Sequence, residues 1–150
     1  LWQFRISTGM WSQSQHRSLL APAPRSMHVA VMVNGNLWLH GGVGPAGQQL
    51  GDAWTFNIST ATWALLTTGP PPRQGHVAVN EADERVWIHG GRGGANISTT
   101  LADLWFFDLI TGIWTKPEVS TAKPRAREQH VAVFAARSIW LQGGLDGSQY

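Results

Sequence analysis

Residues 25–31 read Arg25-Ser-Met-His28-Val-Ala-Val31, and the same pattern returns twice further along the chain. The later copies are Arg73-Gln-Gly-His76-Val-Ala-Val79 and Arg127-Glu-Gln-His130-Val-Ala-Val133. The histidines of successive copies are 48 and 54 residues apart. A pattern that returns at a nearly fixed period is the signature of a repeat protein, so this repeat decides the fold.

The rest of each repeat is marked by glycine pairs and tryptophans. An apolar stretch after each copy ends in two glycines, which are Gly41-Gly42, Gly90-Gly91 and Gly143-Gly144. A second half follows, in which two tryptophans lie nine residues apart: Trp54 and Trp63, then Trp105 and Trp114. The chain also begins on such a half, with Trp2 and Trp11. These glycines and tryptophans are therefore predicted to be structural positions of the repeat.

Each repeat contains four short segments that are typical of β-strands. In the first repeat they are predicted at His28–Val33, Asn36–His40, Ala53–Asn57 and Thr62–Leu66, with Asn34-Gly35 as a two-residue hairpin turn. Four strands in a repeat of about 50 residues are typical of a β-propeller. We therefore predict an all-β fold, a β-propeller of four-stranded antiparallel blades.

The repeats divide the chain unevenly. Residues 25–66 and 73–116 are predicted to be complete blades, whereas 1–15 supply strands three and four and 127–150 strands one and two of a split blade. About three blades are fewer than the four to eight of known propellers. The chain is therefore expected to be a window of a longer array, with further blades from the same chain. The alternative is that a second copy completes a six-bladed ring.

The pattern resembles the kelch repeat family over essentially the whole chain. Two glycines after an apolar strand, then two spaced tryptophans, are that family's motif, and Pro-Arg pairs precede the strands at Pro24-Arg25, Pro72-Arg73 and Pro124-Arg125. The resemblance implies kelch-type blades, and it implies that proteins or peptides bind at one mouth of the central channel. The motif marks the fold and leaves the function open, because one fold hosts many functions.

The composition excludes several classes of protein. The chain has 150 residues, of which 43% are apolar and 13% charged, and it has no cysteine. It is therefore not a disordered chain, a disulfide scaffold or a cysteine–zinc protein. No apolar run reaches the length of a membrane-spanning helix. The net charge of +2 is spread without a basic stripe, so nucleic acid is not an expected partner.

No catalytic or metal site is predicted. His28, His76 and His130 share one repeat position and His40 and His89 another, which favours packing over metal ligation. Asp52 and Asp103 are also repeat equivalents and are expected to bond turn amides rather than form an acid–base pair. We therefore expect neither an enzyme nor a cofactor, with one alternative: an enzyme whose site is completed by blades outside this segment.

The arginines are the candidate binding residues. Arg25, Arg73 and Arg127 each lie three residues before the repeat histidine and are expected to ring the mouth of the channel, where guanidinium groups bind carboxylates. The alternative is that they brace loops through backbone carbonyls. Non-repeating loop residues would then carry specificity, namely Arg92, Gln48, Gln49 and Glu128. The sequence therefore favours a non-catalytic interaction scaffold for a protein or peptide.

Two sequons suggest a second interpretation. Asn57-Ile-Ser59 and Asn96-Ile-Ser98 fit the acceptor pattern for N-glycosylation and fall at expected turns. They occupy different places in their units, so the repeat does not explain them. The alternative function is therefore a structural module of a glycosylated extracellular or cell-surface assembly. The sequence is equally compatible with a cytoplasmic location.

Overall fold

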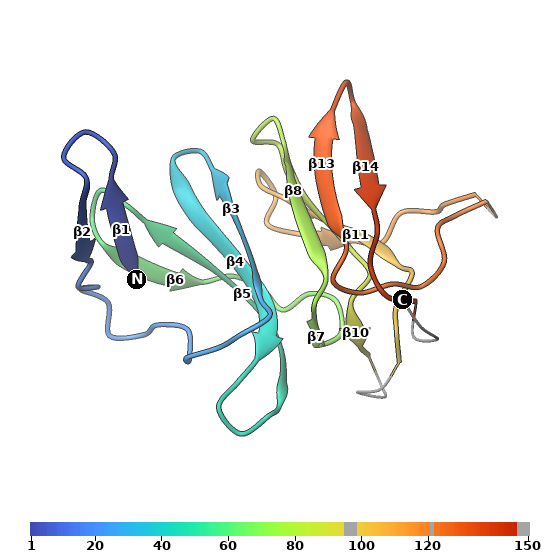
Figure 1. Ribbon diagram of the computed structural model, residues 1–150, viewed down its shortest axis with the longest axis horizontal. Helices are drawn as coiled ribbons and strands as arrows, with labels where there is room; N and C mark the ends of the chain where they lie inside the picture. The colour runs from blue at the N-terminus through green and yellow to red at the C-terminus, as the bar shows by residue number, and fades with distance from the viewer. Residues whose placement is uncertain (95–98, 121, 147–150) are drawn as a thin grey trace.

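The computed structural model describes residues 1–94, 99–120 and 122–146, and every regular element in these ranges is a β-strand (Figure 1). These ranges hold no helix that could cross a membrane. The strands are β1 (Trp2–Arg5), β2 (Met10–Gln13), β3 (Val29–Val33), β4 (Asn36–Val43), β5 (Gln49–Asn57), β6 (Thr62–Leu65), β7 (Arg73–Gln74), β8 (Val77–Glu81), β9 (Arg85–His89), β10 (Arg92–Gly93), β11 (Leu104–Asp108), β12 (Trp114–Thr115), β13 (Val131–Ala135) and β14 (Ser138–Gln142).

Two four-stranded antiparallel sheets form the centre of the molecule. The first sheet has the order β3-β4-β5-β6 and the second the order β8-β9-β11-β12. The hairpin β1–β2 lies beside the first sheet and the hairpin β13–β14 beside the second (Figure 1). The predicted all-β fold of four-stranded antiparallel units is thus confirmed.

Strand boundaries differ from the prediction at the glycine pairs. β4 continues through Gly41 and Gly42 to Val43, and β5 begins at Gln49 rather than Ala53. The strands can continue because a bulge between His40 and Gly42 absorbs the irregular backbone. Elsewhere β3 begins one residue later than predicted, after Met27 with φ of 54°, and β6 ends one residue earlier.

The first strands of the repeats run side by side. β8 contacts β3 on one side and β13 on the other, and Figure 1 shows the three strands in the middle of the molecule. At their hairpin ends, the amide of Asn80 donates to the backbone oxygen of Met32 at 2.7 Å. Small Val and Ala side chains allow these strands to approach one another closely.

The hydrophobic core lies between the two four-stranded sheets. Trp38, Val86, Ile88 and Phe107 are buried together there, and the ring of Trp114 lies 5.8 Å from that of Trp38. The equivalent tryptophan in β14, Trp140, is 62% exposed, whereas Trp38 is 1% exposed. Trp38 and Trp114 therefore fill the space between the two four-stranded sheets.

The two glycines of each pair permit two different contacts. A Cβ on Gly41, which has φ of 68°, would lie 2.7 Å from the backbone oxygen of Arg73 in the next repeat. A Cβ on Gly42, with φ of 100°, would lie 2.5 Å from the backbone oxygen of Ser26 in the same repeat. Only glycine combines these dihedral angles with such close approach. The first glycine thus permits close contact between neighbouring repeats, and the second permits close contact within its own repeat.

Candidate interaction site at the mouth segments

Three mouth segments, residues 25–28, 73–76 and 127–130, lie next to one another at one end of β3, β8 and β13. The backbone amide of Gly75 donates to the oxygen of Met27 at 3.0 Å, and that of Gln129 donates to the oxygen of Gly75 at 2.7 Å. Each segment also pairs with the residue after its own glycine pair, for example Ser26 with Val43. The backbone therefore places the predicted arginines in a row.

Arg25 and Arg73 are paired with aspartates of their own repeats. Arg73 donates through both terminal nitrogens to the carboxylate of Asp103 at 2.7 and 2.9 Å, and also to the backbone oxygen of Gly90 at 3.1 Å. Arg25 makes the same contacts with Asp52 and Gly41. The Arg73 side chain is fully buried. These two guanidinium groups brace each repeat internally.

Asp52 and Asp103 were expected to bond turn amides, but their carboxylates bind the side chains of an arginine and a tryptophan. The carboxylate of Asp52 also accepts a hydrogen bond from Trp54 Nε1 at 2.6 Å, as that of Asp103 does from Trp105 at 2.8 Å. Burial alone would raise the pKa of Asp52, but hydrogen bonds from Arg25 and Trp54 outweigh it and lower that pKa. Each aspartate therefore stays ionised and links the mouth segment to the third strand.

Arg127 has the same backbone contacts without an aspartate. Its Nε donates to the oxygen of Arg125 at 3.2 Å, and a terminal nitrogen donates to the oxygen of Gly143 at 2.7 Å. Within residues 1–94, 99–120 and 122–146 it forms no ion pair. Its side chain is thus oriented like those of Arg25 and Arg73 while its carboxylate-binding position is open in this part of the chain.

Arg92 is held in place by residues outside the repeat pattern. A terminal nitrogen of Arg92 donates to the carboxylate of Glu128, and the Gln49 side chain donates to the backbone oxygen of Arg92 at 3.0 Å. The Glu128 side chain is 2% exposed, whereas that of Arg92 is 42% exposed. A buried carboxylate thus fixes an arginine that still reaches solvent.

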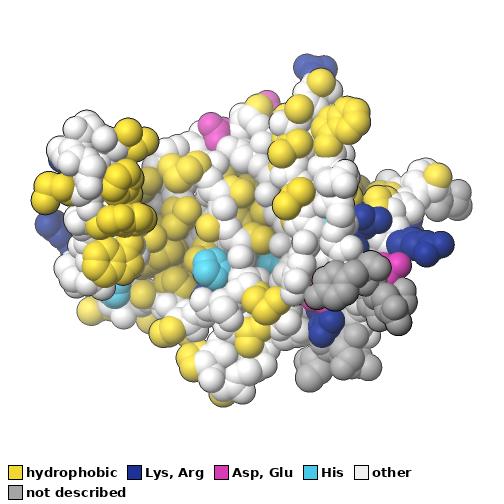
Figure 2. All heavy atoms as spheres, in the orientation of Figure 1, with side chains coloured by type: hydrophobic (Ala, Val, Ile, Leu, Met, Phe, Trp, Pro, Cys, Tyr) yellow, Lys and Arg dark blue, Asp and Glu magenta, His cyan; other side chains and the backbone are white. Residues whose placement is uncertain are grey.

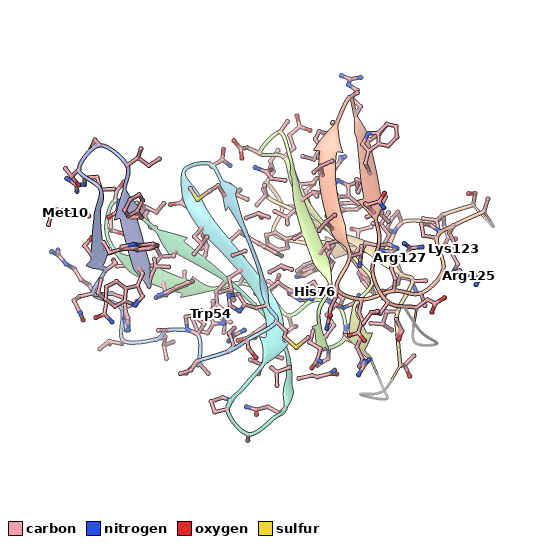
Figure 3. All side chains as sticks on the ribbon, viewed as in Figure 1. Met10, Trp54, His76, Lys123, Arg125 and Arg127 are labelled. Carbon is pink, nitrogen blue, oxygen red and sulfur yellow. The ribbon has the colours of Figure 1, made fainter. Side chains whose placement is uncertain are left out.

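Further cations lie at or near the third mouth segment, residues 127–130. The backbone amide of Gly91 donates to the oxygen of Arg127, so Arg92 lies beside the third mouth segment. Figure 3 shows Lys123, Arg125 and Arg127 close together, and Figure 2 shows dark-blue side chains gathered on that side of the molecule. We call Arg92, Lys123, Arg125 and Arg127 the cationic cluster. Its cations outnumber the carboxylates that pair with them, Glu128 and Asp146.

The repeat histidines form hydrogen-bonded pairs between repeats. His40 Nδ1 lies 3.0 Å from His76 Nε2, and His89 Nδ1 lies 3.0 Å from His130 Nε2. Burial lowers the pKa of His40 to about 3 and that of His130 to about 4. The described part of the chain contains no group of three or more potential metal ligands. The histidines therefore connect repeats as neutral side chains.

The remaining predicted residues are loop and sequon positions. Gln48 stabilises its own turn by accepting a hydrogen bond from the Ala46 amide at 3.0 Å. Asn57 Oδ1 accepts from the amides of Ser59 and Thr60, as Asp108 Oδ1 does from the amides of Ile110 and Thr111. Asn57 thus occupies a repeat position after all, with a capping role. Asn96 lies outside the described residues.

The sequence analysis identified most residues of the site but not the partners to which they bind. The histidine pairs were not anticipated, although the two recurring histidine positions were the available signal. Glu128 stands where the other repeats have Ser26 and Gln74, and that break in the pattern could have marked it as a partner for Arg92. Both features involve residues 36 or more positions apart.

The molecule consists of repeated four-stranded sheets that are joined through paired glycines and have tryptophans packed between them. This arrangement defines a repeat protein of the propeller class. The chain belongs to the kelch-repeat family: the model for the KLHDC2/KLHL20/DRC7 Kelch-repeats domain matches residues 1–144. This family membership confirms the predicted kelch-type fold.

Several curated proteins are similar to the chain. The Rab9 effector protein with kelch motifs from Bos taurus is 27% identical over 150 residues, which cover 97% of this chain and 40% of that protein. The F-box/kelch-repeat protein At1g51550 from Arabidopsis thaliana is 34% identical over 139 residues, 79% of this chain and 29% of that protein. Host cell factor 2 from Homo sapiens is 26% identical over 167 residues, 96% of this chain and 21% of that protein.

The chain spans about 40% of the length of the Rab9 effector proteins that it matches. Kelch-repeat relatives of this kind are interaction proteins, and one of them is named as an effector of Rab9. The expected class of function, an interaction protein, is thus supported at the level of the family.

Proposed function

We propose that this chain is a non-catalytic interaction scaffold that binds an acidic peptide segment of a partner protein beside the third mouth segment, residues 127–130. Arg92 is the proposed anchor. The observation that carries the proposal is that Arg92 is held by buried Glu128 and by Gln49, yet its side chain is 42% exposed. An arginine with a fixed orientation loses little conformational freedom when it binds a carboxylate.

The charge of the surroundings supports an acidic partner. Arg127 belongs to the mouth segment beside Arg92, and Figure 3 shows Lys123 and Arg125 near Arg127. Glu128 and Asp146 do not pair with all of these cations. Such a surface attracts carboxylates and orients them for hydrogen bonding with guanidinium groups. Arg25 and Arg73 support the site indirectly, because their side chains are buried and are paired within their own repeats, whereas that of Arg92 reaches solvent.

A selection from a library of short random peptides tests this function. Peptides selected on the immobilised chain are expected to be enriched in Asp and Glu, and their binding is expected to weaken as salt rises. Arg92→Ala is expected to weaken the best peptide by about tenfold or more. The matched control is Arg137→Ala, an exposed arginine at the far end of the β13–β14 hairpin. Equal enrichment on the Arg92→Ala protein would contradict the proposal.

A further inference from the structure

A cavity of about 350 Å³ opens between the two four-stranded sheets, where β3 turns into β4 and β11 into β12. Its walls include Val33, Trp38 and Thr55 from the first repeat and Phe107 and Ile110 from the second. The mouth segments precede β3 and β8, so the cavity lies at the opposite end of the strands from the proposed peptide site. Its volume is within the range of pockets that bind small molecules.

The second sheet shows how its own side chains fill the equivalent place. A terminal nitrogen of Arg85 lies 3.6 Å from the carboxylate of Glu81, and the Arg85 guanidinium lies 5.2 Å from the centre of the Phe106 ring. The Phe106 ring in turn lies 4.8 Å from that of Trp87. Nε1 of Trp87 donates to the Glu81 carboxylate at 2.6 Å. This tryptophan is thus covered and has its hydrogen bond.

The first repeat has different residues at these three positions. The strand register places Val33 at the position of Glu81, Asn36 at that of Arg85 and Thr55 at that of Phe106. All three line the cavity. Trp38, the equivalent of Trp87, lacks the carboxylate, and its Nε1 is buried without a hydrogen-bond partner among the described residues. Packing alone does not favour an open volume beside an unpaired donor.

The chemistry of the walls indicates the class of ligand. None of the described residues that line the cavity is charged. A charged ligand would therefore lose its hydration there without gaining a counterion. Phe107, Leu109 and Ile110 provide apolar walls, and Asn36 and Thr55 provide polar groups. Ile110 is 86% exposed, so a ligand would also cover apolar surface that now faces solvent.

We propose that this cavity binds an uncharged aromatic small molecule. Its ring lies over Thr55, in the position that Phe106 has in the second sheet, and contacts Phe107 and Ile110. The site uses residues of two complete sheets and none of the mouth segments, so it can fail or hold independently of the proposed peptide site.

Fluorine NMR with para-fluoroacetophenone as the probe tests this site on the whole protein. The uncharged probe is expected to bind about tenfold or more tightly than para-fluorobenzoate or para-fluorobenzylammonium, which have a similar ring and a charge. Equal binding of the three compounds, or no binding of the uncharged probe, would overturn the proposal. N-acetyl-phenylalanine methylamide is the competitor that represents a side chain of a partner protein. If it displaces the probe at a lower concentration than unlabelled acetophenone does, the site is for a protein, and the proposal is wrong.

Variants assign the binding to the cavity. Thr55→Phe restores the residue of the second repeat and fills the cavity, so it is expected to weaken the uncharged probe about tenfold or more. Thr55→Val keeps the size of the side chain and is expected to stay within about threefold of the unmodified protein. Thr115→Phe is the matched control, because Thr115 is exposed on β12 and is not a wall residue. Binding that survives Thr55→Phe, or that Thr115→Phe removes equally, would contradict the assignment.

A variant that gains binding makes the test independent of any loss of folding. Asn36→Arg introduces the cation that Arg85 supplies in the second repeat. It is expected to bind para-fluorobenzoate more tightly than the unmodified protein does, by about tenfold, because the carboxylate gains a counterion. Unchanged binding of para-fluorobenzoate by this variant would show that the probe lies elsewhere and would overturn the proposal.

Discussion

His40 and His76 connect two neighbouring sheets through a single hydrogen bond between their imidazole rings, with Nδ1 of the first 3.0 Å from Nε2 of the second. One nitrogen must carry the proton and the other must accept it, so at least the acceptor ring is neutral. Burial is the main cause that lowers the pKa of both side chains. The contact between sheets therefore depends on neutral histidine.

The free energy of unfolding is expected to fall on acidification at pH values well above those at which carboxylates titrate. The pKa of His40 is lowered to about 3 and that of His130 to about 4, from an ordinary value of 6.5. The unfolded chain then binds more protons than the folded chain between these values and 6.5, so stability falls as the pH falls through 6.5. Each such histidine contributes a slope of up to about 1.4 kcal/mol per pH unit. Urea unfolding followed by tryptophan fluorescence from pH 7.5 to 5 measures the slope.

The control for this prediction comes from the repeat itself. Gln142 stands in the third repeat where His40 and His89 stand in the others. His40→Gln is therefore expected to keep a hydrogen bond to His76, to leave stability at pH 7.5 within about 1 kcal/mol, and to reduce the pH slope. The carboxylates Asp52 and Asp103 have lowered pKa values and lose their contribution only at lower pH. An unchanged slope in the variant would refute the assignment.

The fold could be predicted from the sequence because the pattern of each strand occurs in more than one repeat. Val-Ala-Val, the glycine pairs and the spaced tryptophans each recur, so one ambiguous copy is corrected by the others. The site was harder, because its contacts depend on which repeats face each other. Arg25 and Asp52 could be marked as repeat positions, but their pairing across 27 residues follows only from the close packing of the mouth segment against the third strand. Glu128 and Arg92 occur once, so no repeat could indicate their pairing.

Removal of the buried Arg73 side chain is expected to be strongly destabilising. Arg73→Met keeps most of the side-chain volume but leaves the Asp103 carboxylate without its ionic partner. Breaking a buried pair in this way costs about 3–5 kcal/mol. Arg25→Met is expected to cost less, because the Asp52 side chain is 30% exposed and can be hydrated. Urea unfolding at pH 7.5 compares the two variants, and a loss below about 1 kcal/mol for Arg73→Met would contradict a bracing role.

The double variant separates the charge from the packing. Arg73→Met with Asp103→Leu removes both charges, so it is expected to be more stable than Arg73→Met alone. If the double variant is less stable than the single variant, the loss comes from packing or from the hydrogen bond between Asp103 and Trp105 rather than from an unpaired carboxylate.

Alanine at the first glycine of a pair is expected to test the contact between repeats. Gly41 and Gly143 both have φ of 68°, so the cost of alanine in this backbone conformation, about 1 kcal/mol, is shared by both. Only at Gly41 would the new Cβ also approach the Arg73 oxygen at 2.7 Å and the His76 ring at 2.9 Å. Gly41→Ala is therefore expected to lose about 1–3 kcal/mol more than Gly143→Ala in thermal or urea unfolding. Equal losses would show that the backbone angle alone requires glycine.

Glycosylation of Asn57 can be tested separately from its capping role, because the two depend on different atoms. Oδ1 caps the turn by accepting from the amides of Ser59 and Thr60, and glycan attachment requires Nδ2. Asn57→Asp keeps the cap, as Asp108 shows in the second repeat, and Ser59→Ala keeps Asn57 but destroys the sequon. In a secretory host, with Ser98→Ala present to remove the Asn96 sequon, the parent protein is expected to carry one glycan mass that both variants lose. Both are expected to unfold within about 0.5 kcal/mol of an enzymatically deglycosylated parent. A parent protein of bare mass would exclude modification at Asn57 and leave it as a turn cap alone.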